Sequence, residues 1–121
     1  MKRIAIWLDD LRNPENHAYS MLLDTYAPNA SVLWVKTVSE FKEAVTRVIG
    51  NQDQQLIALF FDNDLGTKLE GCDAFNWFEA LVYSDNIKRV GLYAQTQNTS
   101  AKLRLEQGFA ALERHWYDVE D

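Results

Sequence analysis

The chain of 121 residues has one cysteine, two histidines and two prolines. With Cys72 alone, neither an intramolecular disulfide nor a zinc or iron–sulfur centre built on several cysteines is possible. We therefore expect Cys72 to be a small structural residue. His17 and His115 lie far apart in the sequence. A lone histidine is seldom a ligand or a catalyst, so we expect no functional role for either.

Long apolar runs and an excess of positive charge are also absent. No apolar run approaches the roughly 18 residues of a membrane span, and the opening MKRIAIWLDD reaches acid too soon for a signal peptide. The formal net charge is −6. A field of that sign repels polyanions and argues against broad binding to DNA or to anionic membranes. We expect a cytoplasmic protein whose phosphate chemistry, if any, is confined to a local site.

The composition, with 47% hydrophobic and 25% charged residues, is that of a globular protein. The length predicts one domain over 1–121. Short apolar runs alternate with segments of helical periodicity. Strands are predicted at 3–8, 31–36, 56–61 and 89–94. This alternation predicts an α/β fold of three layers with a mainly parallel sheet of about five strands.

The helical segments are a weak one ending near Tyr26 and three clearer ones at 38–49, 73–83 and about 98–107. The first of the three is the clearest, because Thr37 and Glu40 have the spacing of a capping box. Gly50 and Gly108 are the expected ends of two of these helices. The pattern of residues 109–118 fits a fifth strand or a helix, and the choice stays open.

Every residue of the run LIALFF, 56–61, is hydrophobic. Such a run predicts a strand buried on both faces, as in a parallel sheet covered by helices. The large aromatic residues in the predicted elements should belong to the core. They are Trp7, Trp34, Trp77 and Phe78.

Acidic residues follow two of the predicted strands. Asp9 and Asp10 end the first, and Asp62 ends the third, with Asp64 two residues on. The carboxyl ends of parallel strands meet at one edge of a sheet, where ligands bind. Two carboxylates about 5 Å apart repel by about 3 kcal/mol at an effective dielectric near 20, so a shared proton or a cation must compensate.

Oxygen ligands without histidine or cysteine favour a hard ion, Mg²⁺ first, with Mn²⁺ or Ca²⁺ as alternatives. The sequence thus predicts a metal site at Asp9, Asp10 and Asp62. Each aspartate taken alone also fits a plain turn or helix cap. A capping role is the favoured interpretation for Asp73.

Two other known motifs match residues 62–73 in part, but each lacks a feature that its family requires. Residues 62–73 resemble a calcium-binding EF-hand loop in their acid spacing, but Gly66 and Thr67 occupy the positions that need a ligand and a glycine. The Asp-x-Asp of Asp62 and Asp64 is similar to that of haloacid-dehalogenase-type phosphatases. That motif follows the first strand of a longer chain in those enzymes, whereas here it follows the third.

The overall pattern resembles the response-regulator receiver domain, which has a flavodoxin-like fold. Acids after the first and third strands, Gly71-x-Asp73 opening a helix and a hydroxyl at Thr96 carry the resemblance. It implies that Asp9 and Asp10 bind metal and that Asp62 accepts phosphate. Receivers carry a lysine after their fifth strand, and this sequence has no lysine after Lys102.

Three short segments resemble the divergent, cyclic-phosphate-processing branch of receivers more closely. They are WLDDLRNP, FFDNDLG and YAQTQNTSA, and the resemblance covers roughly residues 4–105. Members of that family typically read Asp-His-Asp-Leu-Gly and His-Ser-x-Asn in the second and third segments. Here Asn63 and Gln95 replace the two histidines, while Thr96 and Asn98 keep the hydroxyl and the amide.

This resemblance implies a metal-dependent site for a phosphorylated nucleotide or RNA end, with cyclic phosphates among the candidates. Asp64 would be a further ligand or a base that activates water. Arg12, Thr96 and Asn98 would contact the phosphate. The alternative is a degenerate receiver without enzymatic activity whose acidic face docks a partner protein.

Overall fold

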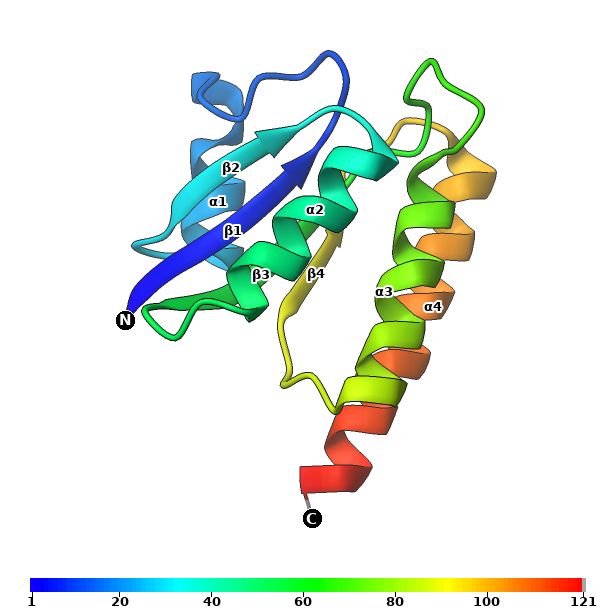
Figure 1. The fold of residues 1–121 in the computed structure, drawn as a ribbon. Coiled ribbons are helices and arrows are strands. Elements are labelled where there is room, and N and C mark those ends of the chain that lie inside the picture. The colour runs from blue at the N-terminus through cyan, green and yellow to red at the C-terminus, as the bar shows by residue number, and fades with distance from the viewer. Residues whose placement is uncertain (121) are drawn as a thin grey trace.

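The computed structural model describes residues 1–120 and has the predicted α/β architecture. Its four strands form one parallel sheet in the order β2-β1-β3-β4 (Figure 1). The strands are β1 (Lys2–Leu8), β2 (Ser31–Val35), β3 (Gln54–Phe61) and β4 (Gly91–Ala94). The helices are the 3₁₀ helix η1 (His17–Tyr19), α1 (Ser20–Tyr26), α2 (Val38–Ile49), α3 (Gly71–Asp85) and α4 (Thr99–Glu120).

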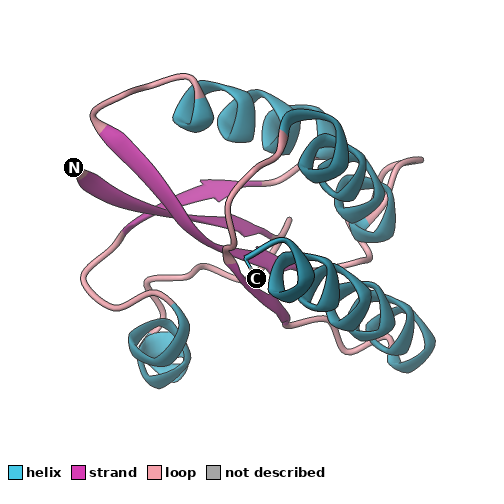
Figure 2. Cartoon of the chain, turned by 90° about the horizontal axis from the view of Figure 1, so that it is seen from below, coloured by secondary structure: helices cyan, strands magenta, loops and turns pink. Residues whose placement is uncertain are grey.

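Helices cover both faces of the sheet, which gives the three predicted layers (Figure 2). On one face, α2, α3 and α4 pack over a cluster that includes Ile6, Leu59 and Phe61. On the other face, α1 packs over a smaller cluster centred on Trp7 and Phe60. Phe60 and Phe61 are both fully buried and point to opposite faces. The prediction that β3 is buried on both sides is confirmed.

The expectation of about five strands was wrong by one, because residues 109–118 lie within α4, a helix of 22 residues. Its buried apolar positions recur every three or four residues: Leu105, Phe109, Leu112 and Trp116. That spacing is the period of a helix and not of a strand. In residues 1–120, neither α4 nor a shorter helix is long and apolar enough to cross a membrane.

Gly108 was expected to end a helix, but α4 continues through it. A Cβ atom at this position would lie 2.5 Å from a ring carbon of Phe75 on α3. The glycine therefore lets two helices approach closely, which a local stop signal does not reveal.

The predicted helix starts are close to the observed ones. Thr37 caps α2 and accepts a 3.1 Å hydrogen bond from the N–H of Glu40. The third helix begins at Gly71 and not at Asp73, because Glu70 is its N-cap. Asp73 accepts a 2.8 Å bond from the Glu70 N–H and completes a capping box, so the capping role predicted for Asp73 is confirmed.

The prediction of a core position was wrong for one tryptophan. Trp7 and Phe78 are fully buried and Trp77 is partly buried, but Trp34 is 37% exposed. It lies on β2, the edge strand, where no further strand covers it. Strand order, which the sequence pattern does not reveal, decides this exposure.

Candidate metal and phosphate site

The acidic residues after β1 and β3 meet at the carboxyl edge of the sheet. β1 and β3 are neighbours, and Leu8 pairs with Phe61, so the residues that follow them emerge side by side. Asp9, Asp10 and Asp62 each place one carboxylate oxygen within 4.8 Å of the others. This is the convergence that the sequence predicted.

Asp9 organises the loop that follows β1. Its side chain is completely buried. Its Oδ1 accepts bonds from the backbone N–H groups of Leu11 (2.9 Å) and Arg12 (2.8 Å), and its Oδ2 lies 3.3 Å from the Arg12 guanidinium. Short polar side chains commonly fix turns in this way. Asp9 is thus both a turn former and a member of the acidic cluster.

Asp62 lies between a like charge and a cation. Its side chain is 6% exposed, and the Arg12 guanidinium lies 3.5 Å from its Oδ1. Burial, with the nearby Asp9 carboxylate as a second cause, raises the pKa of Asp62 from 3.8 to about 6, although Arg12 opposes the change. The single guanidinium therefore leaves the repulsion within the cluster incompletely balanced.

Asp10 has an oxygen without a partner. Its Oδ1 is buried and makes no hydrogen bond within residues 1–120. Gly66, at φ 68°, lies beside its other oxygen, and a Cβ there would stand 3.5 Å from Oδ2. A buried polar atom left unpaired is costly, and three carboxylates without histidine or cysteine suit a hard divalent ion. The donor set therefore fits Mg²⁺ or Mn²⁺.

A pocket of about 280 Å³ opens over this cluster. Every candidate site residue predicted from the sequence except Asp9 lines it. The lining comprises Asp10, Leu11, Arg12, Asp62, Asp64, Thr96, Gln97 and Asn98. The structure thus gathers acids, one cation, a hydroxyl and amides from three loops around one space.

Asp64 faces this pocket but is not one of the three acids that meet. Its Oδ1 accepts bonds from the side-chain amides of Asn63 (3.2 Å) and Asn98 (3.3 Å). Asn98 also accepts a bond from the Ala101 N–H at the start of α4. The β3–α3 and β4–α4 loops are therefore joined through the Asp64 carboxylate.

Two indoles fix the loop between β1 and η1. Trp7 Nε1 donates to the Arg12 carbonyl oxygen at 2.9 Å, and Trp34 Nε1 donates to the Asp9 carbonyl oxygen at 2.7 Å. Sequence reasoning missed both contacts, since it assigned these side chains to the core alone. A polar group on a large apolar side chain was the available signal.

A family model described as "Cyclic-phosphate processing Receiver domain" matches residues 4–111. The chain belongs to this family. No curated protein and no solved structure gave a match. The matched region includes β1 from Ile4 onward, β3, β4 and the loops that follow these strands. The acidic cluster of this receiver domain therefore lies within the family region.

The receiver domain carries amides where the resemblance implied histidines, and the structure shows what they do. Asn63 is fully buried; its amide donates to Glu70 (3.1 Å) and accepts from the Cys72 N–H (3.0 Å). Gln95 donates to the Leu8 carbonyl oxygen at 3.1 Å, while its own Oε1 is buried without a partner in residues 1–120. Asn63 thus ties its loop to the start of α3, and Gln95 ties its loop to β1. Neither side chain supplies a proton-transfer group.

Proposed function

We propose that this receiver domain binds Mg²⁺ or Mn²⁺ and, next to it, the phosphate of a phosphorylated nucleotide or RNA end. A 2′,3′-cyclic phosphate is the first candidate. One observation carries the proposal: Asp10 has a buried, unpartnered oxygen, and its carboxylate lies close to those of Asp9 and Asp62, which share one arginine. The family match supports phosphate chemistry of this class.

In this proposal the three acids have different tasks. Asp10 and Asp62 present oxygens to the ion, and Mg²⁺ usually takes only one or two protein carboxylates. Asp9 keeps the loop in shape through its bonds to backbone N–H groups and adds negative charge. When bound, the divalent ion neutralises charge on the phosphate oxygens.

The remaining pocket residues would handle the phosphate and water. Arg12 extends a guanidinium over the cluster and would pair with a phosphate oxygen. The Thr96 hydroxyl and the Asn98 amide line the same pocket and would donate to the phosphate. The exposed Asp64 carboxylate is the candidate base, since it lines the pocket and two amides hold it in place.

Calorimetric titration with MgCl₂ tests the metal site directly. The expected result is saturable binding to the wild type and none to Asp62→Asn or Asp10→Asn. Asp53→Asn is the matched control, because Asp53 is exposed and precedes β3 at the far end of the sheet. Unchanged titrations for Asp62→Asn would remove the basis of the proposal.

Turnover is a separate question, answered by following 2′,3′-cyclic AMP with ³¹P NMR in the presence of MgCl₂. Opening of the cyclic phosphate should require the ion and should fall at least tenfold in Asp64→Asn, given the usual contribution of general base catalysis. Metal binding should persist in that variant. Retained turnover in Asp64→Asn would assign the base elsewhere.

A second candidate function is a protein-interaction module without catalysis. It is favoured by Asn63 and Gln95, whose amides are engaged in holding loops. Thermal melting with MgCl₂, with beryllofluoride and with nucleotide separates the two. A ligand that binds the native state raises the stability by RT ln(1 + [L]/Kd), so an unchanged melting temperature would favour the interaction module.

A further inference from the structure

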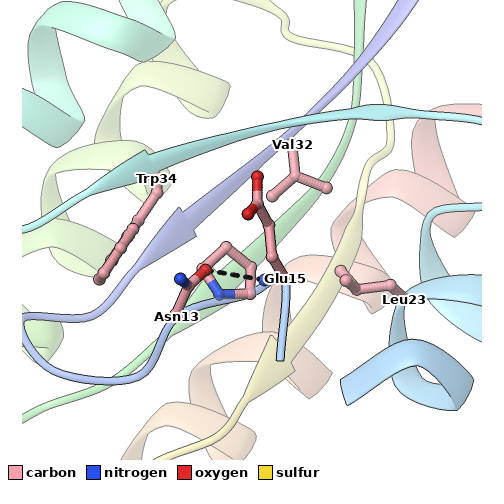
Figure 3. A pocket seen from close by; sticks show the side chains of 6 residues that line it. Asn13, Glu15, Leu23, Val32 and Trp34 are labelled. Carbon is pink, nitrogen blue, oxygen red and sulfur yellow. Dashed lines mark hydrogen bonds between the residues drawn. The ribbon is translucent and has the colours of Figure 1, made fainter. Parts of the chain in front are cut away.

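A long groove lies beside β2, away from the acidic cluster. Two adjoining pockets of about 430 and 450 Å³ share Pro14, Glu15, Leu23 and Val32. Trp34 and Asn13 line one of them (Figure 3). The groove therefore runs along the α1 side of β2, between the loop before η1 and helix α1.

The outer edge of β2 is available for pairing. In residues 1–120 the strand pairs only with β1. The Val35 carbonyl oxygen accepts a hydrogen bond from the Asp9 N–H on the β1 side. The backbone N–H and C=O groups of successive strand residues point to alternate sides. The backbone groups of Val32 and Trp34 therefore point away from β1, toward the free edge. The Lys36 N–H is already used by Glu40, so the free edge ends at Trp34.

The charged side chains that line the groove are all acidic. Glu15 and Asp24 line it, and no lysine, arginine or histidine does. In Figure 3 the Glu15 carboxylate points toward Val32 over the groove, and it makes no ion pair or hydrogen bond with residues 1–120. Lys36 Nζ lies 4.5 Å from the centre of the Trp34 ring, so this indole already has one cationic neighbour.

We propose that this groove binds an extended, arginine-bearing peptide segment of a partner protein. The peptide backbone would add to the edge of β2 by hydrogen bonds to Val32 and Trp34, as in other cases of strand addition. An arginine side chain on the groove side would lie against the Trp34 ring and pair with Glu15. A second arginine two residues along would face the same side and approach Asp24.

The same observations disfavour other occupants. Two carboxylates repel the phosphates of a nucleic acid. A second copy of this chain carries the same net charge of −6, so like charges would meet. An extended segment also needs a strand edge, which the groove provides and a nucleotide would not use.

Fluorescence anisotropy with a labelled peptide, Thr-Val-Arg-Val-Arg-Val-Thr, tests the proposal on the intact protein. The expected Kd lies in the micromolar range, as for small interfaces. A peptide with glutamate at both arginine positions should bind at least tenfold more weakly, since each exposed ion pair or cation–π contact is worth a few-fold. Methylation of the peptide N–H groups that face β2 should abolish binding.

The corresponding change in the protein is Glu15→Arg, which removes the carboxylate that would pair with a peptide arginine. Peptide binding to this variant should weaken about tenfold. Glu43→Arg is its control, because Glu43 is exposed on α2 at the opposite face of the sheet. Amide resonances of Val32 and Trp34 should shift on titration with peptide. No peptide binding at 1 mM, equal binding of the glutamate peptide, an unaffected Glu15→Arg variant, or preference for single-stranded RNA would each overturn the proposal.

Discussion

The indole N–H of Trp34 donates a 2.7 Å hydrogen bond to the backbone carbonyl oxygen of Asp9. The bond joins the edge strand β2 to the loop that carries two of the three acids. The Trp34 side chain on β2 thereby helps to position Asp9 and Asp10, the candidate metal ligands that follow β1. Backbone positions in that loop depend on it, because a hydrogen bond to a carbonyl restricts rotation of the peptide that it joins.

The first prediction concerns this contact. Trp34→Phe keeps the ring but removes the donor, and we expect the free energy of unfolding to fall by about 1 kcal/mol. The Kd for Mg²⁺ should rise several-fold, because Asp9 and Asp10 lose part of their positioning. Urea denaturation and calorimetry measure the two effects. Trp77→Phe is the control, since the Trp77 indole N–H makes no hydrogen bond within residues 1–120; equal Mg²⁺ binding in both variants would contradict the prediction.

A second prediction follows from the pKa of Asp62, about 6 in the folded protein against 3.8 ordinarily. The folded state binds this proton more tightly than the unfolded state does. The stability that it contributes is complete below pH 3.8 and is lost as the pH rises through 6. Between pH 5 and 7.5 in EDTA, the wild type should therefore lose about 1–2 kcal/mol more of its unfolding free energy than Asp62→Asn.

The measurement is urea denaturation of both proteins at the two pH values. Saturating MgCl₂ should restore the stability of the wild type at pH 7.5 and leave Asp62→Asn unchanged, because the ion compensates the ionised carboxylate. If the unfolding free energy of the wild type instead rises from pH 5 to pH 7.5 relative to that of Asp62→Asn, the pKa of Asp62 is not raised in the folded state. That result would refute this account of the cluster.

Arg12 gives a third prediction with two opposite effects. Its guanidinium lies within 3.5 Å of Asp62 and so competes with a divalent ion for the same negative charge. Arg12→Gln should tighten Mg²⁺ binding by about three- to tenfold, a modest electrostatic effect for a partly exposed group. Binding of 2′,3′-cyclic AMP in the presence of MgCl₂ should weaken by a similar factor or more.

Calorimetric titrations of both ligands check the two signs. Arg47→Gln is the control, because Arg47 is exposed near the end of α2 and away from the pocket. Weaker binding of both ligands to Arg12→Gln would mean that the arginine only shapes the loop.

The fourth prediction concerns the close approach of α3 to the end of β3. A Cβ on Gly71 would lie 1.9 Å from the backbone oxygen of Asp62, a distance that forces the backbones apart. Gly71→Ala should lower the free energy of unfolding by about 3 kcal/mol or more and abolish Mg²⁺ binding. Gly50→Ala should have little effect on either, since Gly50 adopts an ordinary φ of −78°. Denaturation curves that coincide with the wild type would contradict this packing.

Local pattern was a good guide where a single element carries its own signal. Thr37 and Glu40 predicted the start of α2, and the unbroken apolar run before Asp62 predicted a strand buried on both faces. The pattern failed at Gly108 because the glycine accommodates the ring of Phe75. A contact between two helices leaves no periodic trace near the glycine itself.

The site was likewise predictable only in part. The order of acids and amides along the chain pointed to Asp9, Asp10 and Asp62 as a group, and the structure brings them together. Which acid has a free oxygen was not predictable, because the partners of Asp9 and the isolation of Asp10 Oδ1 depend on the path of one loop. The engagement of Asn63 with Glu70 depends on a loop in the same way.

The sequence alone specified the alternation of strands and helices and the acids that end two strands. Both depend only on hydrophobic periodicity and on the order of residues along the chain. The neighbour relation of β1 and β3, the exposure of Trp34 on an edge strand and the hydrogen bond from its indole to Asp9 were decided by the tertiary structure. The physical reason is that each depends on contacts between segments far apart in the chain, which packing of the whole domain selects.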